Sequence, residues 1–512
     1  MDVLTEIPIA VTRENYVQIA GELKLSYAVL KRLANVRPQI LLSDDACFYD
    51  IETEKNKFTL GVVNDRLFTD PAEMLKYIQR FDVCCGFNTY RYDNEVLYRH
   101  KNMASFFKTI DYRNFILHKI GRCINIDLLP VYMLHSPFSN RHRLDDLAKE
   151  LNVKRQCNDY TEEKCREDVQ IIQKFYPIAK ELLNWIETSF FVDPETICVL
   201  YYKDFVKLRR WCLQSWMLQH GIYPKLIKVE DDRKPSFYRS YRKGFFGDIN
   251  VFDVRSSYPT TAVNLNCSIY RSGDFAEYER FLLEQRDKCQ RIGTFIKWLG
   301  NATIGDQNYT DGLLYNKKIM IDVWLEFKKV MTKWIEQIGK ENVIFAYTDS
   351  IFTKLSSVPE IPPYTVQLKH KYKWVAIYNQ IRYVAQIKDT NSIHKVHFDR
   401  KLNLKLFDYM DEKIHEKLLD DPIAFIKDPK LDTSLADFPE DTFKIVVFKK
   451  DNVCRNIEYL LLWNDFEYGL NNAYLSRKGL TQDPKKICFA RYQKFYDYYL
   501  GLFKLSGGEI EA

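Results

Sequence analysis

The sequence predicts a multidomain protein of mixed α/β and α+β class. Its 512 residues are several times the length of a typical domain, from which we expect about three or four compact units. In a first region, short apolar strands alternate with helical segments, and in a second region strand-like runs carrying aspartates alternate with longer helices. Hydrophobic residues make up 46% and charged residues 28% of the chain, which is the balance of a globular protein rather than of a disordered or fibrous one.

The secondary structure is expected in the following order. Residues 1–43 show helical spacing of apolar side chains. The first region then contains strands at 46–49 and 58–62, helices at 71–80 and 144–151, and a long helix at 163–188. The second region contains a strand at 249–254, helices at 275–290 and 317–338, and a strand hairpin at 343–355.

Composition excludes several classes of protein. There is no apolar run near the roughly 18 residues that span a bilayer, and the amino terminus lacks the features of a secretory signal. We therefore expect a cytoplasmic protein with no membrane association. The 12 cysteines and 9 histidines show no zinc or iron-sulfur spacing, so a metal would have to be held by carboxylates, which favours Mg²⁺ or Mn²⁺. The net charge of +6 leaves nucleic acid open as a partner.

Acidic residues in the first region form one candidate site. Asp50 and Glu52 lie two apart at the end of an apolar strand, so both carboxylates point to one face. Asp93 follows a short buried strand, and Asp168 lies on the long helix. Such a cluster can hold two divalent ions about 4 Å apart, the arrangement that hydrolyses a phosphodiester. Taken singly, an Asp-x-Glu pair is more often a solvated surface feature.

In this order, these segments resemble the three motifs of the DnaQ-like 3'-5' proofreading exonucleases attached to family B DNA polymerases, which have an RNase H-like fold. The resemblance implies that Asp50, Glu52, Asp93 and Asp168 are catalytic, with Asp50, Glu52 and Asp168 as metal ligands. It also implies that Thr53 and Asn88 contact the frayed strand. The family has a tyrosine four residues before the last aspartate, where this chain has Lys164, and we expect reduced rather than absent proofreading.

A second candidate site lies further along the chain. An apolar strand delivers Asp253 and is stopped by Pro259, and the 343–355 hairpin presents Asp349 at its turn. The two acids can therefore face each other across adjacent strands. Between them, Lys297 and Asn301 share a helical face, on which the lysine can meet a triphosphate.

These three segments resemble motifs A, B and C of family B DNA polymerases, which implies a right-hand polymerase following the exonuclease domain. By resemblance, Asp253 and Asp349 hold two Mg²⁺ or Mn²⁺ ions, and Lys297 neutralises charge on the leaving pyrophosphate. The resemblance also assigns contacts with DNA or nucleotide to seven residues: Tyr258, Asn301, Arg286, Tyr241, Gly244, Arg382 and Tyr383.

Four positions depart from the polymerase motifs. The first aspartate of motif C is Tyr347, the serine and tyrosine of motif B are Ala302 and Ile304, and the lysine of the primer-contact motif is Ile381. Both metal-binding aspartates are kept, so we expect polymerase activity with altered metal preference or fidelity.

The resulting domain prediction has six segments. They are an N-terminal helical segment (1–43), a 3'-5' exonuclease domain (44–195), a first palm part (196–272), fingers (273–305), a second palm part (306–384) and a thumb (385–512). The short distance between motifs A and B leaves no room for large insertions, which suggests a compact phage, viral or mobile-element replicase in the host cytoplasm or nucleoid. We expect a monomer that uses primer-template DNA, dNTPs and a processivity or replisome protein. Two alternatives stay open, namely a nucleic-acid-binding pseudo-polymerase with at most exonuclease activity, and a processing nuclease.

Overall fold

The computed structural model divides the chain into two compact units, residues 1–235 with 256–326 and residues 236–255 with 327–512. The structure describes residues 17–18, 30–31, 33–34, 39–54, 56–90, 92–100, 103–112, 115–139, 142–155, 161–200, 205–222, 227–308, 314–398, 405–433, 445–446, 459–462, 480–481 and 489–511. Within them, no helix is long and apolar enough to cross a membrane.

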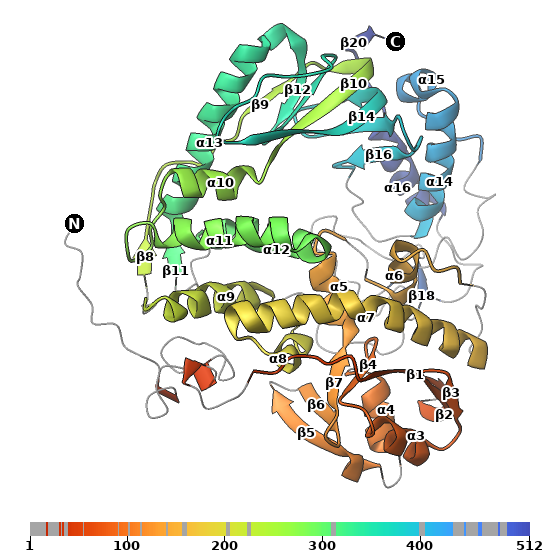
Figure 1. Cartoon of the computed structure of the whole chain (residues 1–512). Coiled ribbons are helices and arrows are strands. Elements are labelled where there is room, and N and C mark those ends of the chain that lie inside the picture. The colour runs from red at the N-terminus through yellow and green to blue at the C-terminus, as the bar shows by residue number, and fades with distance from the viewer. Residues whose placement is uncertain are drawn as a thin grey trace. The chain divides into compact units, whose positions relative to one another are not determined.

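The first unit is built around a five-stranded sheet of order β3-β2-β1-β4-β7 (Figure 1). β1 pairs antiparallel with β2 and parallel with β4, and β4 is parallel with β7. Every residue of β4 is buried, as expected for a strand in the middle of a sheet that is covered on both faces. The strands of this unit are β1 (Ala46–Glu54), β2 (Lys57–Val63), β3 (Arg66–Phe68), β4 (Val83–Gly86), β5 (Phe107–Tyr112), β6 (Phe115–Ile120), β7 (Ile124–Asp127), β8 (Ile227–Val229) and β11 (Leu314–Asn316).

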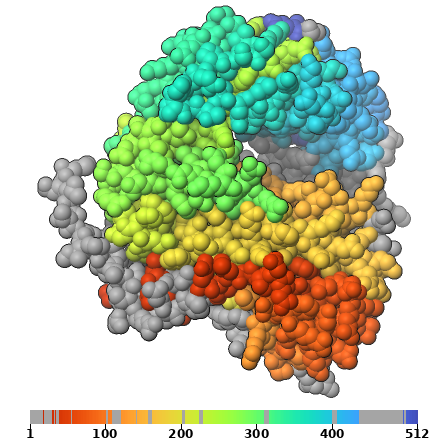
Figure 2. All heavy atoms as spheres, in the orientation of Figure 1, coloured from red at the N-terminus to blue at the C-terminus, as the bar shows by residue number. Residues whose placement is uncertain are grey.

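The long helix α7 ties this sheet to the helices that follow. The helices of the first unit are α3 (Pro71–Ile78), α4 (Asp93–Arg99), α5 (Leu128–His135), α6 (Leu144–Glu150), α7 (Glu162–Phe190), α8 (Pro194–Cys198), α9 (Phe205–Gln219), α10 (Ser257–Asn264), α11 (Asp274–Lys288) and α12 (Gly293–Asp306). Thr161 caps α7 by accepting a hydrogen bond from the Lys164 amide, and α7 ends at Phe191 in a left-handed conformation. Figure 2 shows the atoms of α7, in yellow, packed against the red and orange atoms of the sheet region.

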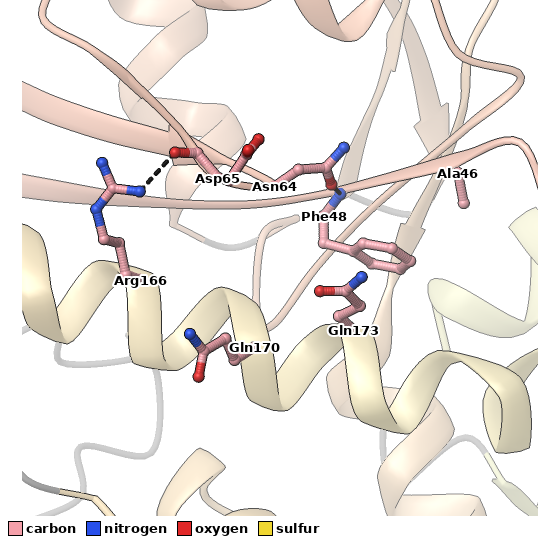
Figure 3. Close-up of a pocket in the computed structure, with 7 residues that line it drawn as sticks. All are labelled: Ala46, Phe48, Asn64, Asp65, Arg166, Gln170 and Gln173. Carbon is pink, nitrogen blue, oxygen red and sulfur yellow. Dashed lines mark hydrogen bonds between the residues drawn. The ribbon is translucent and has the colours of Figure 1, made fainter.

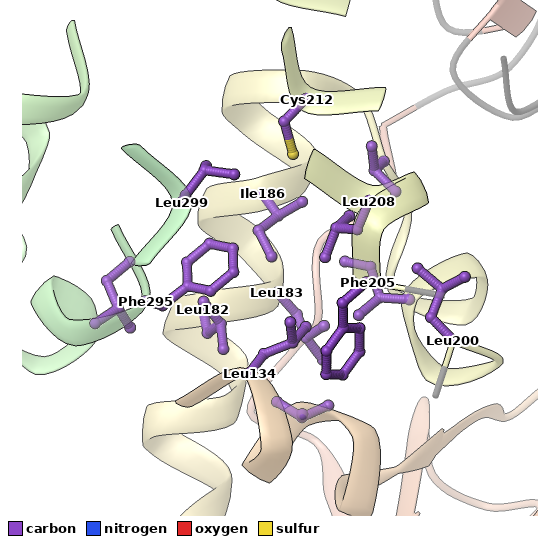
Figure 4. Close-up of a cluster of buried hydrophobic side chains, with 14 of the residues drawn as sticks. Leu134, Leu182, Leu183, Ile186, Leu200, Phe205, Leu208, Cys212, Phe295 and Leu299 are labelled. Carbon is purple, nitrogen blue, oxygen red and sulfur yellow. The ribbon is translucent and has the colours of Figure 1, made fainter. Parts of the chain in front are cut away.

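The C-terminal half of α7 lies in a buried cluster shared with α5, α9 and α12 (Figure 4). Leu182, Leu183 and Ile186 of α7 contribute to it, together with Leu208 of α9 and Phe295 of α12. The five-stranded sheet and helices α9 to α12 therefore share one hydrophobic core. For this reason the chain forms two compact units, and the expectation of three or four was wrong.

The second unit contains an eight-stranded sheet of order β16-β15-β14-β10-β13-β12-β9, with β20 also paired to β10. Its strands are β9 (Arg239–Tyr241), β10 (Gly244–Arg255), β12 (Val343–Tyr347), β13 (Ser350–Thr353), β14 (Thr365–Ile377), β15 (Tyr383–Ile387), β16 (Ile393–Val396), β17 (Ile445–Val446), β18 (Tyr459–Leu462), β19 (Leu480–Thr481) and β20 (Glu509–Glu511). Its helices are α14 (Lys405–Asp420), α15 (Pro422–Lys427) and α16 (Phe489–Gly501), and α13 (Lys317–Ile338) contributes residues to both units.

Strand β20 pairs parallel with the first residues of β10, Gly244 opposite Glu509. The backbones approach so closely that a Cβ atom on Gly244 would lie 2.3 Å from the Glu509 carbonyl oxygen. Arg242 forms ion pairs with Glu509 and Glu511. The two acidic side chains of β20 therefore neutralise a basic residue next to β10.

Most of the expected elements of both regions are present. The predicted helices at 163–188 and 317–338 correspond to α7 and α13, and the predicted hairpin corresponds to β12 and β13. The strand expected at 249–254 is longer, since β10 begins at Gly244 and pairs with β14 along its whole length. Most of the helical segment predicted at 1–43 lies outside the described residues. The six domain boundaries stay predictions.

Candidate active sites

The register of β10 and β13 brings the two motif aspartates of the second unit together. Asp253 lies opposite Ser350 in this antiparallel pair. The Ser350 hydroxyl donates a hydrogen bond of 2.5 Å to Asp253 Oδ1, and the Val254 amide donates one of 2.9 Å to the Asp349 carbonyl oxygen. Asp253 is 4% exposed. A carboxylate on β10 and a second one in the turn between β12 and β13 are a donor set that fits Mg²⁺ or Mn²⁺.

The turn that carries Asp349 is held in an uncommon backbone conformation. Thr348 has a φ of 55°, which is rare for a β-branched residue and is found where the surrounding structure imposes it. The Thr348 hydroxyl donates a 2.9 Å hydrogen bond to Asp349 Oδ1. The hairpin therefore fixes the orientation of the Asp349 carboxylate.

Two cationic side chains that the sequence analysis missed lie at this site. Lys369 of β14 places Nζ 3.4 Å from Asp253 Oδ1, and the Arg239 guanidinium lies 5.4 Å from the centre of the Tyr347 ring. Tyr347 occupies the position of the first motif C aspartate. No local signal reveals these partners, because β10–β14 and β9–β12 pairing joins residues about a hundred positions apart in the chain.

The remaining predicted residues of the second unit have different surroundings. Tyr241 is exposed, and Gly244 is the residue that β20 approaches. Tyr383 is buried, with its ring centre 5.1 Å from that of Phe352. Arg382 lies over the Phe398 ring.

The motif B residues lie on α12 in the first unit. Lys297 and Asn301 are both half-buried and one helical turn apart, which confirms the predicted shared face. Arg286 of the neighbouring helix α11 donates a hydrogen bond to the Ser256 hydroxyl. Tyr258 lies on α10, directly after β10 in the chain, and is half-buried.

The acidic residues of the first region lie on β1, α4 and α7, and the charges of Asp50 and Glu52 act on Asp93. Asp50 and Glu52 lie on β1, Asp93 begins α4, and Asp168 lies on α7. Helix α7 contacts β1 directly, because Cys165 Sγ donates to the Asp50 carbonyl oxygen over 3.3 Å.

Two cations pair with this acidic cluster. Lys164 Nζ lies 3.2 Å from Glu52 Oε1. Arg155 forms an ion pair with Asp168 and places Nη1 2.6 Å from Asp145 Oδ1. Arg155 carried no signal in the sequence, because it lies outside all the motifs.

The ionised forms of the other two carboxylates, Asp50 and Asp93, are disfavoured. Burial, with added repulsion from Glu52, raises the pKa of Asp50 to about 7. Burial and repulsion from Asp50 raise the pKa of Asp93 well above its usual range. Among the residues that the structure describes, the buried oxygens Asp93 Oδ2 and Asp168 Oδ1 have no hydrogen-bond partner. Nevertheless, across the described part of the chain no group of three or more His, Cys, Asp or Glu side chains is arranged to hold a metal ion.

Two further predicted residues border the acidic cluster. The Thr53 hydroxyl lies 2.6 Å from the Tyr92 hydroxyl. Asn88 has a φ of 62°, and its amide donates a 2.8 Å hydrogen bond to Asp127 Oδ1. The loop that carries Asn88 is therefore fixed to the end of β7.

A pocket of about 330 Å³ lies beside β1 and α7 (Figure 3). Polar side chains of Asn64, Gln170 and Gln173 line it together with Phe48. Arg166 closes one side of it by donating to the Asp65 carbonyl oxygen, a 2.5 Å contact. It contains none of the acidic motif residues.

Compared with models of known protein families and with curated protein sequences, the chain gives no match. Among solved structures, it is similar to the family B DNA polymerase from the hyperthermophilic archaeon Pyrobaculum calidifontis. The TM-score is 0.62 at 13% sequence identity, and the alignment covers 91% of this chain and 78% of that chain. The chain therefore has a fold like that of a family B DNA polymerase.

Proposed function

We propose that the protein is a DNA-templated DNA polymerase with a 3'-5' exonuclease site, acting in replication of a phage, viral or mobile-element genome. The observation that carries the proposal is the pairing of β10 with the β12–β13 hairpin, which sets Asp253 beside Ser350 and the Asp349 backbone. The fold likeness to a family B DNA polymerase over 91% of the chain supports it.

Asp253 and Asp349 are the residues that would hold two Mg²⁺ or Mn²⁺ ions. Ions bound there supply Lewis-acid activation and charge stabilisation for phosphoryl transfer. The chain's own contribution is positional, because the Ser350 and Thr348 hydroxyls each orient one carboxylate. Lys297 and Arg286 are proposed as ligands of the triphosphate, and Tyr258 and Asn301 as nucleotide contacts.

Primer-template DNA and dNTPs are the proposed substrates, with Tyr241, Gly244, Arg382 and Tyr383 as candidate DNA contacts. Tyr383 contributes from the core of the sheet, because its ring is buried. A processivity or replisome protein is the proposed partner of a monomeric enzyme.

A second candidate is a nucleic-acid-binding pseudo-polymerase. Two contacts favour it, namely the ion pair of Lys369 with Asp253 and the cation–π contact of Arg239 with Tyr347. A positive charge at either position opposes the binding of a metal ion. The two readings differ in one property, which is template-directed extension.

The decisive experiment extends a labelled primer on a longer template with Mg²⁺ and all four dNTPs, beside the same mixture without dNTPs. We expect full-length product in the first and slow shortening in the second. Asp253→Asn should abolish extension and leave shortening unchanged. Asp248→Asn is the matched control, because Asp248 lies on the same strand with an exposed side chain. Absence of extension by the unaltered protein, in Mg²⁺ and in Mn²⁺, would favour the pseudo-polymerase.

A further inference from the structure

Strand β20 lies beside the start of β10 (Figure 1) and brings two carboxylates onto basic side chains of the second unit. Arg242 forms ion pairs with Glu509 and, over 3.0 Å, with Glu511. Lys354 Nζ lies 2.8 Å from Glu511 Oε2. We call Arg242, Lys243 and Lys354 the basic patch. Two of its three cations are thus engaged by the carboxylates of β20.

Parts of the sheet other than β20 hold the basic patch in place. The Arg242 amide donates a 2.8 Å hydrogen bond to the Ile344 carbonyl oxygen of β12, and the Arg242 guanidinium lies 5.3 Å from the centre of the Phe246 ring. Lys354 directly follows β13. The patch would therefore keep its position if β20 moved away.

Two glycines connect β20 to the core that precedes it. Leu505 is buried, and its amide donates a 2.8 Å hydrogen bond to the Ile426 carbonyl oxygen. Gly507 and Gly508 follow with φ values of 72° and 116°, a conformation that glycine adopts more readily than other residues. They form a short hinge, so β20 can leave β10 while the chain up to Leu505 stays packed.

Few buried contacts hold β20 on the sheet. It is three residues long, and its one apolar side chain, that of Ile510, is 45% exposed. The carboxylates of Glu509 and Glu511 are 51% and 38% exposed, and the side chains of Arg242 and Lys354 are 35% and 52% exposed. Ion pairs as exposed as these each favour the contact by no more than about fivefold. A competing anion of higher charge can therefore displace them.

The chemistry around the patch indicates what that anion is. The Tyr241 side chain is 41% exposed and directly precedes Arg242 and Lys243. An exposed aromatic ring beside several cations suits a single-stranded nucleic acid, whose bases stack on the ring and whose phosphates pair with the cations. A strand that presents successive phosphates at the patch competes with Glu509 and Glu511 for the same cations.

We propose that β20 is an internal competitor of DNA, which covers the basic patch until phosphates of the template strand take the place of Glu509 and Glu511. This rests on the proposed polymerase function, in which Tyr241 and Gly244 are candidate DNA contacts, and adds a step to it. Docking of β20 and binding of the template strand at the patch exclude each other.

The test measures binding of a fluorescently labelled single-stranded oligonucleotide to the full chain by anisotropy, in EDTA, which withholds divalent ions from the proposed exonuclease. Glu509→Gln with Glu511→Gln removes the competing charges. We expect Kd to fall about tenfold, because the unaltered protein binds only through the fraction of molecules in which β20 has left the patch. Glu416→Gln with Asp432→Asn is the matched control, since these two acids pair with lysines of α14 instead. It should leave Kd within about twofold of the unaltered value.

Gly508→Ala separates the docking of β20 from its charge. A Cβ atom there would lie 2.6 Å from the Lys243 carbonyl oxygen, in a backbone conformation with a φ of 116°, so the substitution opposes docking while both acids remain. We expect Kd to fall in this variant too. Gly501→Ala, with nothing within 4 Å of its Cβ atom, should leave Kd unchanged. Circular dichroism and thermal unfolding identify any variant that does not fold.

Hydrogen exchange of the unaltered protein observes the displacement directly. The amides of residues 509–511 should exchange faster once the oligonucleotide is added. Unchanged or slower exchange would overturn the proposal, as would a Kd that neither the charge variant nor Gly508→Ala lowers.

Failure of this proposal and failure of the polymerase proposal are read from different measurements. Primer extension depends on Asp253, which none of these variants changes. Absence of extension together with a lower Kd in the variants would remove the polymerase and leave β20 as a competitor of DNA. Extension by the unaltered protein together with an unchanged Kd in the variants would do the reverse.

Discussion

The Arg239 guanidinium lies 5.4 Å from the centre of the Tyr347 ring, on neighbouring strands of one sheet where the two residues are directly paired. This cation–π contact occupies a position at which the polymerase motif has a carboxylate. Tyr347 is thereby part of the packing of the sheet.

We expect Arg239→Ala to lower the free energy of unfolding by about 0.5–1 kcal/mol, the size of a cation–π contact. Tyr347→Phe keeps the ring face and should be nearly neutral. A double-mutant cycle with Tyr347→Ala, measured by urea unfolding, gives the coupling between the two residues. A coupling energy of zero would mean that the contact contributes nothing.

Lys369→Met is expected to lower the Mg²⁺ concentration that gives half-maximal primer extension. The lysine is partly exposed, so its competition with a metal for Asp253 is worth about 1 kcal/mol, or about fivefold in concentration. The measurement is an Mg²⁺ titration of extension rate. Lys371→Met, an exposed lysine two residues along β14, is the control and should not shift the midpoint.

Glu279 is expected to make stability fall as the pH rises. Burial of this side chain in α11 raises its pKa well above the usual range, partly offset by Thr303. The folded protein therefore binds a proton that the unfolded chain releases above its pKa of about 4.5. Glu279→Gln should match the natural protein near pH 4.5 and be progressively more stable than it from pH 5 to pH 8. The measurement is the free energy of unfolding in urea at each pH. If it changed with pH equally in the two proteins, the raised pKa of Glu279 would be contradicted.

Gly244→Ala is expected to weaken the docking of β20, because the added methyl group would meet the Glu509 carbonyl oxygen. Overpacking of this kind costs about 1–3 kcal/mol. Hydrogen exchange of residues 509–511 should become faster in the variant. Gly501→Ala serves as the control, since a Cβ atom there has nothing within 4 Å.

Much of the fold follows from local patterns in the sequence. The amphipathic helices α7 and α13 were predicted from 3.6-residue periodicity, and the hairpin of β12 and β13 from two apolar runs around a polar turn. The sequence also predicted that Asp253 lies next to the hairpin. An acidic residue near the end of an apolar strand is a local pattern, and the pairing of β10 with β13 agrees with the prediction.

The cations of both sites could not be predicted. Lys369, Arg239 and Arg155 meet their partners through strand register or loop placement, which depend on contacts between distant parts of the chain. Lys164 departs from the exonuclease motif, but the motif does not reveal its ion pair with Glu52, which depends on the packing of α7 against β1. The predicted number of compact units was also wrong. Helix α7 packs against both the sheet and helices α9 and α12, and composition does not reveal such packing.

Helix α7 carries Lys164 and Asp168 near its beginning and Leu182 and Ile186 in the core that it shares with α9 and α12. A helix turns by about 100° per residue, so these two sets of side chains keep their directions only if the number of residues between them is constant. One residue inserted at Gln173 would rotate the acidic end away from β1 while the core end stayed in place. The number of residues between the two sets is therefore fixed, and an insertion is expected to be tolerated only outside Glu162–Phe190.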